Sequence, residues 1–361
     1  MNAAGPGAGR PVVPGRRRRG SAHARHEAPG RGLPEEPEPA GALPRPLPLE
    51  WARDGATWPH ADKSRFVSAG GWRWHVQVHQ PAGPAAQEPA VAPGGDAQPA
   101  VLLLHGTGAS AHSWRTFAPL LAGAGHRVLV PDLPGHGFTR AEGRMPLTLP
   151  AMGAAVAALL QALRAEVRWV IGHSAGAAVA AQLALEGAIA PRALVAFNGA
   201  LLPLQGPAGT LFSPVARWLA LNPLVPSLFA WYASQPAVLR RLVDGTGSSI
   251  DDEGRALYGR LVRDPTHVAG ALAMMASWDL RPLQRALPAL AVPLELLVGT
   301  GDRTLPPAHA ERVRALLPAA RITRLPRLGH LMHEEQPLAV WARLRRLLPA
   351  LALDGGAAVA L

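Results

Sequence analysis

The 361-residue sequence predicts an α/β fold in which a mostly parallel central sheet is flanked by helices. Short apolar runs with the length and composition of strands alternate with segments of helical character, an order that produces a parallel sheet. Three of these runs also lead directly into loops whose side chains could perform chemistry. The runs are Val101–Leu104, Trp169–Ile171 and Leu294–Val298.

The individual elements follow in chain order. Residues Trp72 to Val78 alternate between apolar and polar side chains, which is typical of a strand. We expect this strand to form an antiparallel hairpin with a partner just before Val101, its loop lengthened by a Pro/Ala-rich insertion at residues 81–99. Thr148 and Pro150 mark the start of a helix that runs to about Leu163. The other predicted elements are a helix around Trp114–Leu121, a strand at Arg127–Val130, a helix at Ala175–Leu185, a strand at Ala193–Phe197 and a closing helix at Pro337–Leu348.

Gly172-His173-Ser174-Ala175-Gly176 is the most informative stretch, because it lies between an apolar strand and an alanine-rich helix. In a G-x-S-x-G turn the serine occupies a strained strand-to-helix corner, with glycines where a Cβ would clash, so that its hydroxyl stands exposed. Ser174 is therefore the candidate nucleophile. A serine in such a turn can also act only as a helix cap, so the motif needs partners elsewhere in the chain.

Two such partners follow in the chain order serine, acid, histidine. His330 comes after a short strand and would accept the Ser174 proton, then deliver it to the leaving group. Asp302 would orient the imidazole and stabilise its charged form. Negative charge that develops on the attacked carbonyl needs fixed donors, and we expect the backbone N–H groups of Thr107 and Ala175 to supply this oxyanion hole. The scheme requires no metal and no organic cofactor.

Plainer interpretations compete with these assignments. Asp302 could be a turn residue, since Gly-Asp is common in loops and two prolines follow at 306 and 307. His333 and His173 could replace His330 as the base. His330 is favoured because Gly329-His330 closes a strand, whereas His333 precedes a helix entry. Two further histidines, His105 and His136, are expected to be structural or to line the pocket.

Four motifs occur together in the chain: His105-Gly106-Thr107-Gly108-Ala109-Ser110 with Trp114, Pro131-Asp132-Leu133-Pro134-Gly135-His136-Gly137, Gly172–Gly176, and Gly329-His330. From about residue 64 to 350 they resemble the α/β-hydrolase superfamily. The resemblance implies the α/β-hydrolase fold, with a helical cap inserted before the strand that bears the acid.

A narrower resemblance follows from four further segments: Ser64–Val67, Gly71–Gln77, Asn198–Pro203 and Ala273–Leu280. Together they look like the magnesium-chelatase accessory proteins of bacteriochlorophyll biosynthesis. This resemblance implies a link to magnesium–tetrapyrrole assembly, with magnesium chelatase subunits as partners. The chain departs from the pattern by a longer amino-terminal arm and by the insertion after Gln80, and neither includes a residue of the proposed triad.

Between about residues 201 and 280 the strand rhythm stops and the segment becomes helical, broken by Pro203, Pro214, Pro223 and Pro226. We expect this segment to be the cap. Its apolar stretch from Leu211 to Ala233 could pack the cap onto the core, line a pocket for a bulky apolar substrate, or touch a membrane surface. The aromatic residues of the stretch are Phe212, Trp218, Phe229, Trp231 and Tyr232, and the candidate pocket residues are His105, His173, Trp231, Met274 and Trp278.

Composition separates a folded part from low-complexity parts. The first 48 residues hold ten Pro and eight Gly, a share typical of low complexity, so residues 1–50 are predicted to be a disordered arm. Hydrophobic residues make up 48% of the sequence, which allows a large core in the remainder. The absence of cysteine excludes disulfides and thiolate metal sites. The predicted organisation is a first core part at 51–200, the cap at 201–280, a second core part at 281–351 and a flexible tail at 352–361.

The formal net charge of +11 and the run Arg16–Arg19 raise the question of nucleic-acid binding. The positive charge is spread without one dense basic element, and Lys63 is the only lysine, so we expect no nucleic-acid partner. The arginine run lacks a following apolar segment, and no apolar run reaches the length of about 18 residues that spans a membrane. We expect a cytoplasmic protein, with peripheral contact to a membrane left open.

Two functions from different classes remain open. The first is a serine hydrolase that acts on an ester, thioester or similar acyl bond. Its substrate would be a small molecule that is bulky and apolar. The second is a non-catalytic accessory protein that uses a hydrolase scaffold to bind a porphyrin or to assist magnesium chelatase. An intact triad favours chemistry. The serine at position 174 argues against haloalkane dehalogenase or epoxide hydrolase chemistry, both of which use a carboxylate nucleophile, while carbon–carbon bond hydrolysis and perhydrolysis stay open.

Overall fold

A computed structural model of the chain describes residues 46–82, 99–203, 222 and 224–348. Most of the predicted arm, most of the 81–99 insertion and the whole 352–361 tail lie outside these residues. The same holds for Phe212, Trp218, Pro214 and Pro223 of the predicted cap.

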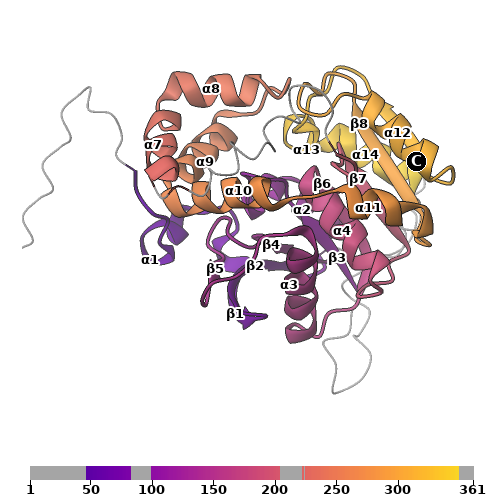
Figure 1. Cartoon of the computed structure of the whole chain (residues 1–361), viewed down its shortest axis with the longest axis horizontal. Helices are drawn as coiled ribbons and strands as arrows, with labels where there is room; N and C mark the ends of the chain where they lie inside the picture. The colour runs from indigo at the N-terminus through magenta and orange to yellow at the C-terminus, as the bar shows by residue number, and fades with distance from the viewer. Residues whose placement is uncertain (1–45, 83–98, 204–221, 223, 349–361) are drawn as a thin grey trace, which may run out of the picture. The chain divides into compact units, whose positions relative to one another are not determined.

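Within the described residues, a nine-stranded sheet forms the centre of the fold (Figure 1). The strand order is β1-β2-β4-β3-β6-β7-β8-β9, with β5 paired to β2. All neighbours from β4 to β9 pair in parallel, whereas β1–β2, β2–β4 and β2–β5 are antiparallel. The strands are β1 (Ser64–Ala69), β2 (Trp72–His79), β3 (Ala100–Leu104), β4 (Arg127–Pro131), β5 (Arg140–Ala141), β6 (Val167–His173), β7 (Ala193–Phe197), β8 (Leu294–Gly299) and β9 (Arg321–Leu325).

We predicted a hairpin between β2 and a strand just before Val101, and this prediction is wrong. β2 pairs instead with the preceding strand β1, with Ala69 opposite Trp72. The turn between them is Gly70-Gly71, whose φ angles of 58° and 79° suit a tight two-residue hairpin that other residues would adopt only with strain. Residues 81–99 therefore connect β2 to β3, and β3 pairs in parallel with β4 and β6.

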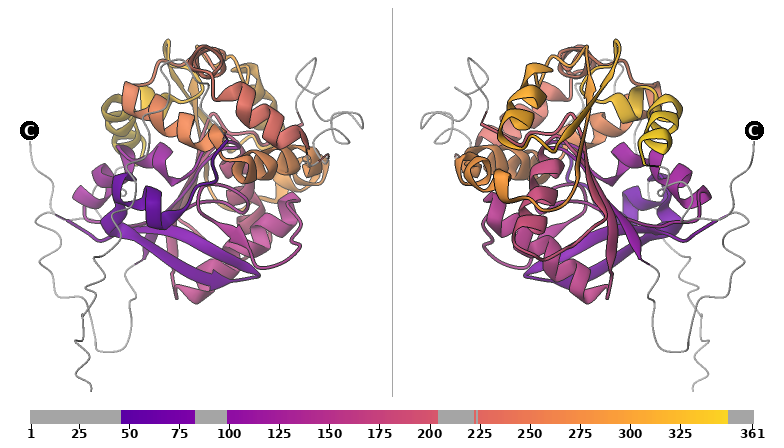
Figure 2. Two further views of the ribbon diagram at one scale, coloured as in Figure 1. Left: turned by 90° about the vertical axis from the view of Figure 1, so that its left-hand side faces the viewer. Right: turned by 90° about the vertical axis from the view of Figure 1, so that its right-hand side faces the viewer.

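Helices cover both faces of the sheet (Figure 2). Successive strand side chains point to opposite faces, so Leu102 and Leu104 pack in one buried cluster with α3 and α4. Val101 and Leu103 belong to the other cluster, with α2 and α14. The helices around the sheet are α1 (Trp51–Asp54), η1 (Gly55–Thr57), η2 (Ala61–Lys63), η4 (Ala111–Trp114), α2 (Phe117–Gly123), α3 (Leu149–Ala162), α4 (Ala175–Leu185), α11 (Arg281–Ala286), η5 (Leu287–Ala289), α12 (Ala308–Leu316), α13 (Met332–Glu335) and α14 (Pro337–Leu347).

Among the described residues, four further helices form an insertion between β7 and β8, here called the helical insertion: α7 (Leu224–Ala233), α8 (Pro236–Asp244), α9 (Asp252–Arg263) and α10 (Pro265–Ser277). We predicted that Pro226 would break the helical segment, and it does not. It lies in the first turn of α7, where a missing N–H costs no helical hydrogen bond. In the described part of the chain, no helix has both the length and the apolar character needed to cross a membrane.

Candidate active site

Ser174 lies at the corner between β6 and α4, as the N-cap residue of that helix. Its backbone has φ 50° and ψ −117°, a conformation that is strained for a residue with a side chain. The corner is tight enough to require its glycines. A Cβ at Gly172 would lie 2.5 Å from the backbone of Ala177, and one at Gly176 would lie 2.2 Å from the Leu104 carbonyl oxygen. This packing fixes the elbow against the end of β3.

His330 and Asp302 lie in hydrogen-bond contact, although 28 residues separate them in the chain. The His330 Nδ1–H donates to Asp302 Oδ2 over 2.7 Å. The other carboxylate oxygen, Oδ1, accepts the backbone N–H groups of Thr304 and Leu305 at 2.8 and 2.9 Å. Asp302 is only 6% exposed, so the carboxylate is held in one orientation and fixes the histidine ring. Ser174 and His330 belong to loops that follow β6 and β9, at the carboxyl ends of the parallel strands.

Asn198 holds the loop that carries His330, a role that the sequence analysis missed. Its side-chain Nδ2 donates to the carbonyl oxygens of Gly329 and His330 at 2.9 and 3.0 Å, while its Oδ1 accepts the Gly299 N–H at 2.8 Å. Asn198 itself has φ 44°, a left-handed conformation that asparagine tolerates better than most residues. The only feature of the sequence that could have indicated this role is the position of the asparagine directly after an apolar strand.

The two expected oxyanion donors lie at the same edge of the sheet. Ala175 is the first residue of α4, where backbone N–H groups have no partner inside the helix. Neither the Ala175 nor the Thr107 N–H donates a hydrogen bond to another described residue. The Thr107 loop adjoins the elbow, since a Cβ on Gly106 would lie 3.0 Å from the Ser174 Cβ. Both N–H groups are thus free to donate to an added ligand.

The model of the alpha/beta hydrolase family matches residues 101–344, which include the elbow, Asp302 and His330. The chain belongs to this family. Over 236 residues it is 44% identical to the "Magnesium-chelatase 30 kDa subunit" of Rhodobacter capsulatus, covering 65% of this chain and 82% of that protein. It is 31% identical to a pimeloyl-[acyl-carrier protein] methyl ester esterase of Aromatoleum aromaticum, over 64% of this chain and 91% of the relative.

Solved structures agree on the architecture. An esterase from Thermogutta terrifontis superimposes with a TM-score of 0.60 at 22% identity, covering 80% of this chain and 99% of that one. At this identity the likeness shows the fold alone. The predicted α/β-hydrolase fold and the resemblance to the magnesium-chelatase proteins are both confirmed.

The competing histidines of this alpha/beta hydrolase family member are buried. His333 is fully buried, stacks on Trp114 at 4.4 Å between ring centres, and has no hydrogen-bond partner for either ring nitrogen among the described residues. Burial lowers its pKa to about 3. His173 packs between His330 and His333, and donates from Nε2 to the His330 carbonyl oxygen at 3.0 Å. Burial also lowers the pKa of His173 well below its usual value, so both rings stay neutral.

The remaining pocket candidates occupy different places. His105 is fully buried and uses both ring nitrogens, one toward the Gly106 carbonyl and one as acceptor of the Leu133 N–H, each at 2.8 Å. Met274 is buried on α10, and its sulfur accepts the Thr107 hydroxyl at 3.6 Å. Trp278 donates from its indole to the Leu147 carbonyl at 3.1 Å. Of these three, Met274 is the one whose side chain bonds Thr107, an expected oxyanion donor.

Trp231, another candidate pocket residue, lies on the surface of α7. It exposes 41% of its surface on α7. The helix buries Pro226, Ala230 and Ala233 instead and turns its bulky side chains outward. An apolar stretch in the sequence cannot reveal which of its faces is covered.

An ion network joins the helical insertion to the segment that follows His330. Arg115 pairs with Glu334 at 2.8 Å and with Asp251, and Tyr258 on α9 donates its hydroxyl to Glu334 at 2.8 Å. The Glu334 side chain is fully buried, and burial raises its pKa to about 7 even though Arg115 opposes the shift. Sequence reasoning missed this network, because Arg115 and Glu334 lie 219 residues apart.

A second Ser–His–Asp arrangement joins the first hairpin to the loop after β4. His75 on β2 bonds Asp132 Oδ2 through Nδ1 at 2.8 Å and the Ser64 hydroxyl through Nε2 at 2.9 Å. Both His75 and Asp132 are fully buried, and the charge and hydrogen bond of His75 help to hold the pKa of Asp132 well below its usual range despite that burial. Asp132 also accepts the backbone N–H groups of Ala111 and Phe138 at 2.6 and 2.8 Å. Within the described ranges, no group of three or more His, Asp or Glu side chains converges as a metal site requires.

Proposed function

We propose that this member of the alpha/beta hydrolase family is a serine hydrolase that acts on an ester-like or acyl bond through Ser174, His330 and Asp302. The observation that carries the proposal is the 2.7 Å hydrogen bond between His330 Nδ1 and Asp302, at the sheet edge where Ser174 is held at φ 50°. A histidine oriented in this way by a carboxylate can take up a serine proton and remain correctly placed.

In this mechanism the Ser174 oxygen attacks the carbonyl carbon of the substrate while its proton moves to His330 Nε2. The negative charge that forms on the carbonyl oxygen is stabilised by the free N–H groups of Ala175 and Thr107. When the tetrahedral intermediate collapses, His330 gives its proton to the leaving alcohol or thiol and an acyl-enzyme remains. Water then attacks the acyl carbon while His330 accepts the water proton. The bond between this carbon and the Ser174 oxygen breaks, that oxygen takes the proton back from His330, and the carboxylic acid leaves.

An apolar substrate fits the surroundings of these groups. The buried thioether of Met274 touches the Thr107 hydroxyl, so the helical insertion contributes an apolar side chain beside the proposed oxyanion hole. We therefore assign the insertion as a cap over the site. The relative named as a methyl ester esterase supports an ester or a similar acyl compound as the substrate class.

A second function rests on the other relative. The chain is 44% identical to a protein named as a magnesium-chelatase subunit, which favours a role in magnesium–tetrapyrrole assembly, and so in bacteriochlorophyll biosynthesis. In that role the scaffold would bind a porphyrin or a chelatase subunit without turnover. The two functions differ in one property: only the hydrolase requires an activated Ser174.

Hydrolysis of p-nitrophenyl esters with acyl chains of increasing length tests the hydrolase. We expect turnover in the full-length protein and a loss of about a thousandfold or more in Ser174→Ala, because the nucleophile is gone. The matched control is Ser64→Ala, which removes a serine from the second Ser–His–Asp arrangement and should retain turnover. Equal turnover in Ser174→Ala and the unmodified protein would refute the assignment.

A further inference from the structure

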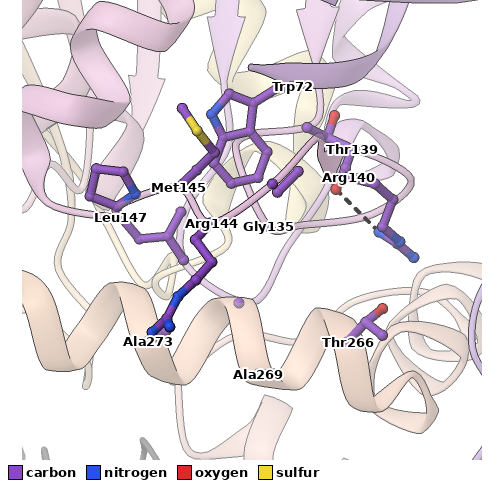
Figure 3. Close-up of a pocket in the computed structure, with 14 residues that line it drawn as sticks. Trp72, Gly135, Thr139, Arg140, Arg144, Met145, Leu147, Thr266, Ala269 and Ala273 are labelled. Atoms are coloured by element: carbon purple, nitrogen blue, oxygen red, sulfur yellow. Dashed lines mark hydrogen bonds between the residues drawn. The ribbon is translucent and has the colours of Figure 1, made fainter. Parts of the chain in front are cut away.

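A cavity lies along α10, apart from the residues of the candidate active site. It has a volume of about 580 Å³, within the range of about 300 to 1,000 Å³ that is typical of small-molecule sites. Its walls come from α10, from the turn after β5 and from the indole of Trp72, as Figure 3 shows. Ser174, His330 and Thr107 are not among its lining residues. We call this cavity the α10 groove.

One wall of the α10 groove is flat and apolar. Thr266, Ala269, Gly270 and Ala273 line it, at positions that follow one stripe of a helix. With a rise of about 1.5 Å per residue, this stripe is about 10 Å long. The small side chains allow an aliphatic chain to lie close to the helix backbone. The neighbouring stripe of α10, with buried His267 and Met274, faces the catalytic loops instead.

The opposite wall supplies larger apolar side chains. Trp72 is 3% exposed at the base of the groove, and Met145 is 36% exposed above it. Leu147 is half-buried beside them. A thioether with three rotatable bonds adapts its shape to a bound chain, so Met145 can close over a ligand. The groove therefore presents apolar surface on two sides.

Two arginines give the groove a positive charge, and one of them has no acidic partner among the described residues. Arg140 forms an ion pair with Asp264 at 2.8 Å, so its charge is balanced. Arg144 is exposed and has neither an ion pair nor a hydrogen bond with any described residue. Figure 3 shows its side chain extending from the loop toward α10, at the end of the groove near Ala273. None of the described residues that line the groove is acidic, which favours an anionic ligand.

We propose that the α10 groove binds an amphipathic monocarboxylate, with its carboxylate paired to Arg144 and its aliphatic tail between the α10 stripe and the side chains of Trp72 and Met145. The guanidinium matches a carboxylate in charge and in planar geometry. The tail gains free energy by leaving water for the two apolar walls. This site is separate from the proposed catalytic centre and does not depend on turnover.

Titration calorimetry with dodecanoate, below its micelle concentration, tests the site in the full-length protein. We expect saturable binding of dodecanoate and much weaker binding of dodecyltrimethylammonium, which has the same tail and the opposite charge. Arg144→Gln should weaken dodecanoate binding about five- to tenfold, the effect of one partly exposed charge pair. The matched control is Arg346→Gln on α14, another exposed arginine, which should bind dodecanoate as the unmodified protein does.

Ala273→Phe tests the position of the tail, because a phenyl ring on the α10 stripe fills the groove. Binding should be lost while the melting temperature shows a folded protein. If that variant does not fold, Arg144→Gln alone decides, since Arg144 is exposed and has no ion pair with another residue that the structure describes. The proposal is overturned if dodecanoate does not bind, if the cationic amphiphile binds equally well, or if Arg144→Gln binds as tightly as Arg346→Gln.

Discussion

Two regions of this alpha/beta hydrolase family member contain a serine together with a histidine that is hydrogen-bonded to an aspartate, yet they differ in backbone and surroundings. In the first hairpin, Ser64 belongs to the strand β1, and its hydroxyl bonds a fully buried His75. At the sheet edge, Ser174 stands on a strained corner between a strand and a helix. Each histidine bonds its aspartate at nearly the same distance, 2.8 and 2.7 Å.

The difference teaches that residue identity alone does not make a nucleophile. The carboxylate of Asp132 accepts two backbone N–H groups from separate loops as well as His75, so it ties the end of β4 to its neighbours. Ser174 instead lies beside two N–H groups that have no partner in the described part of the chain. We interpret the first arrangement as a structural clamp and the second as the catalytic group.

The largest expected difference between the catalytic group and the clamp is the loss of ester turnover when the proposed base, His330, is removed. His330→Ala should reduce ester turnover by about a thousandfold or more, to the level of Ser174→Ala, because members of a triad act as a unit. Its control is His333→Phe, which replaces a buried ring whose nitrogens have no hydrogen-bond partner among the described residues and should retain most of the turnover. Steady-state kinetics on purified variants measure both. Normal turnover in His330→Ala would assign the base elsewhere.

Asp132→Asn addresses the clamp. It leaves a buried histidine without its charged partner and places an amide N–H₂ among groups that donate, so the free energy of unfolding should fall by about 3 to 5 kcal/mol. Chemical denaturation measures this loss. Turnover of the folded fraction should fall far less than in Ser174→Ala. A variant as stable as the unmodified protein would show that the first hairpin does not depend on this clamp.

A smaller, pH-dependent effect on the free energy of unfolding comes from Glu334. This third carboxylate belongs to neither Ser–His–Asp arrangement. Burial raises its folded-state pKa from 4.5 to about 7, so between these values the folded protein holds a proton that the unfolded chain has released. Raising the pH through this window therefore lowers the free energy of unfolding. Relative to Glu334→Gln, the unmodified protein should lose about 2 to 3 kcal/mol between pH 5 and pH 8.

Denaturation of both proteins at the two pH values measures this difference. Parallel pH profiles for the two proteins would contradict the role of Glu334.

Local patterns predicted much of the fold. The helix Ala175–Leu185 and the strand Ala193–Phe197 have the predicted bounds, since an alanine-rich run and an apolar run are each interrupted by polar or glycine-containing residues. The hairpin was mispredicted because strand pairing depends on which turn closes, and the Gly70-Gly71 turn was overlooked. We assigned the Ala/Gly/Pro-rich insertion at residues 81–99 to the hairpin loop, although it connects β2 to β3.

The candidate site was predictable as a set of motifs but not as a network. Ser174, Asp302 and His330 follow strands in a recognisable order, so the sequence pointed to them. Asn198 and Glu334 act through partners about 100 to 200 residues away, and such pairings exist only once the chain is folded. The pair formed by His75 and Asp132 was missed for the same reason, since its members lie 57 residues apart.

The most direct test of the account is to treat the full-length protein with a fluorophosphonate probe and to locate the labelled residue by peptide mass spectrometry. We predict a label on the peptide that contains Ser174, none on Ser64, and no label in Ser174→Ala. A label on Ser64 would reverse the assignment of clamp and catalytic group. A folded protein that stays unlabelled, with a smaller probe as well, would contradict an activated Ser174 and favour the binding role.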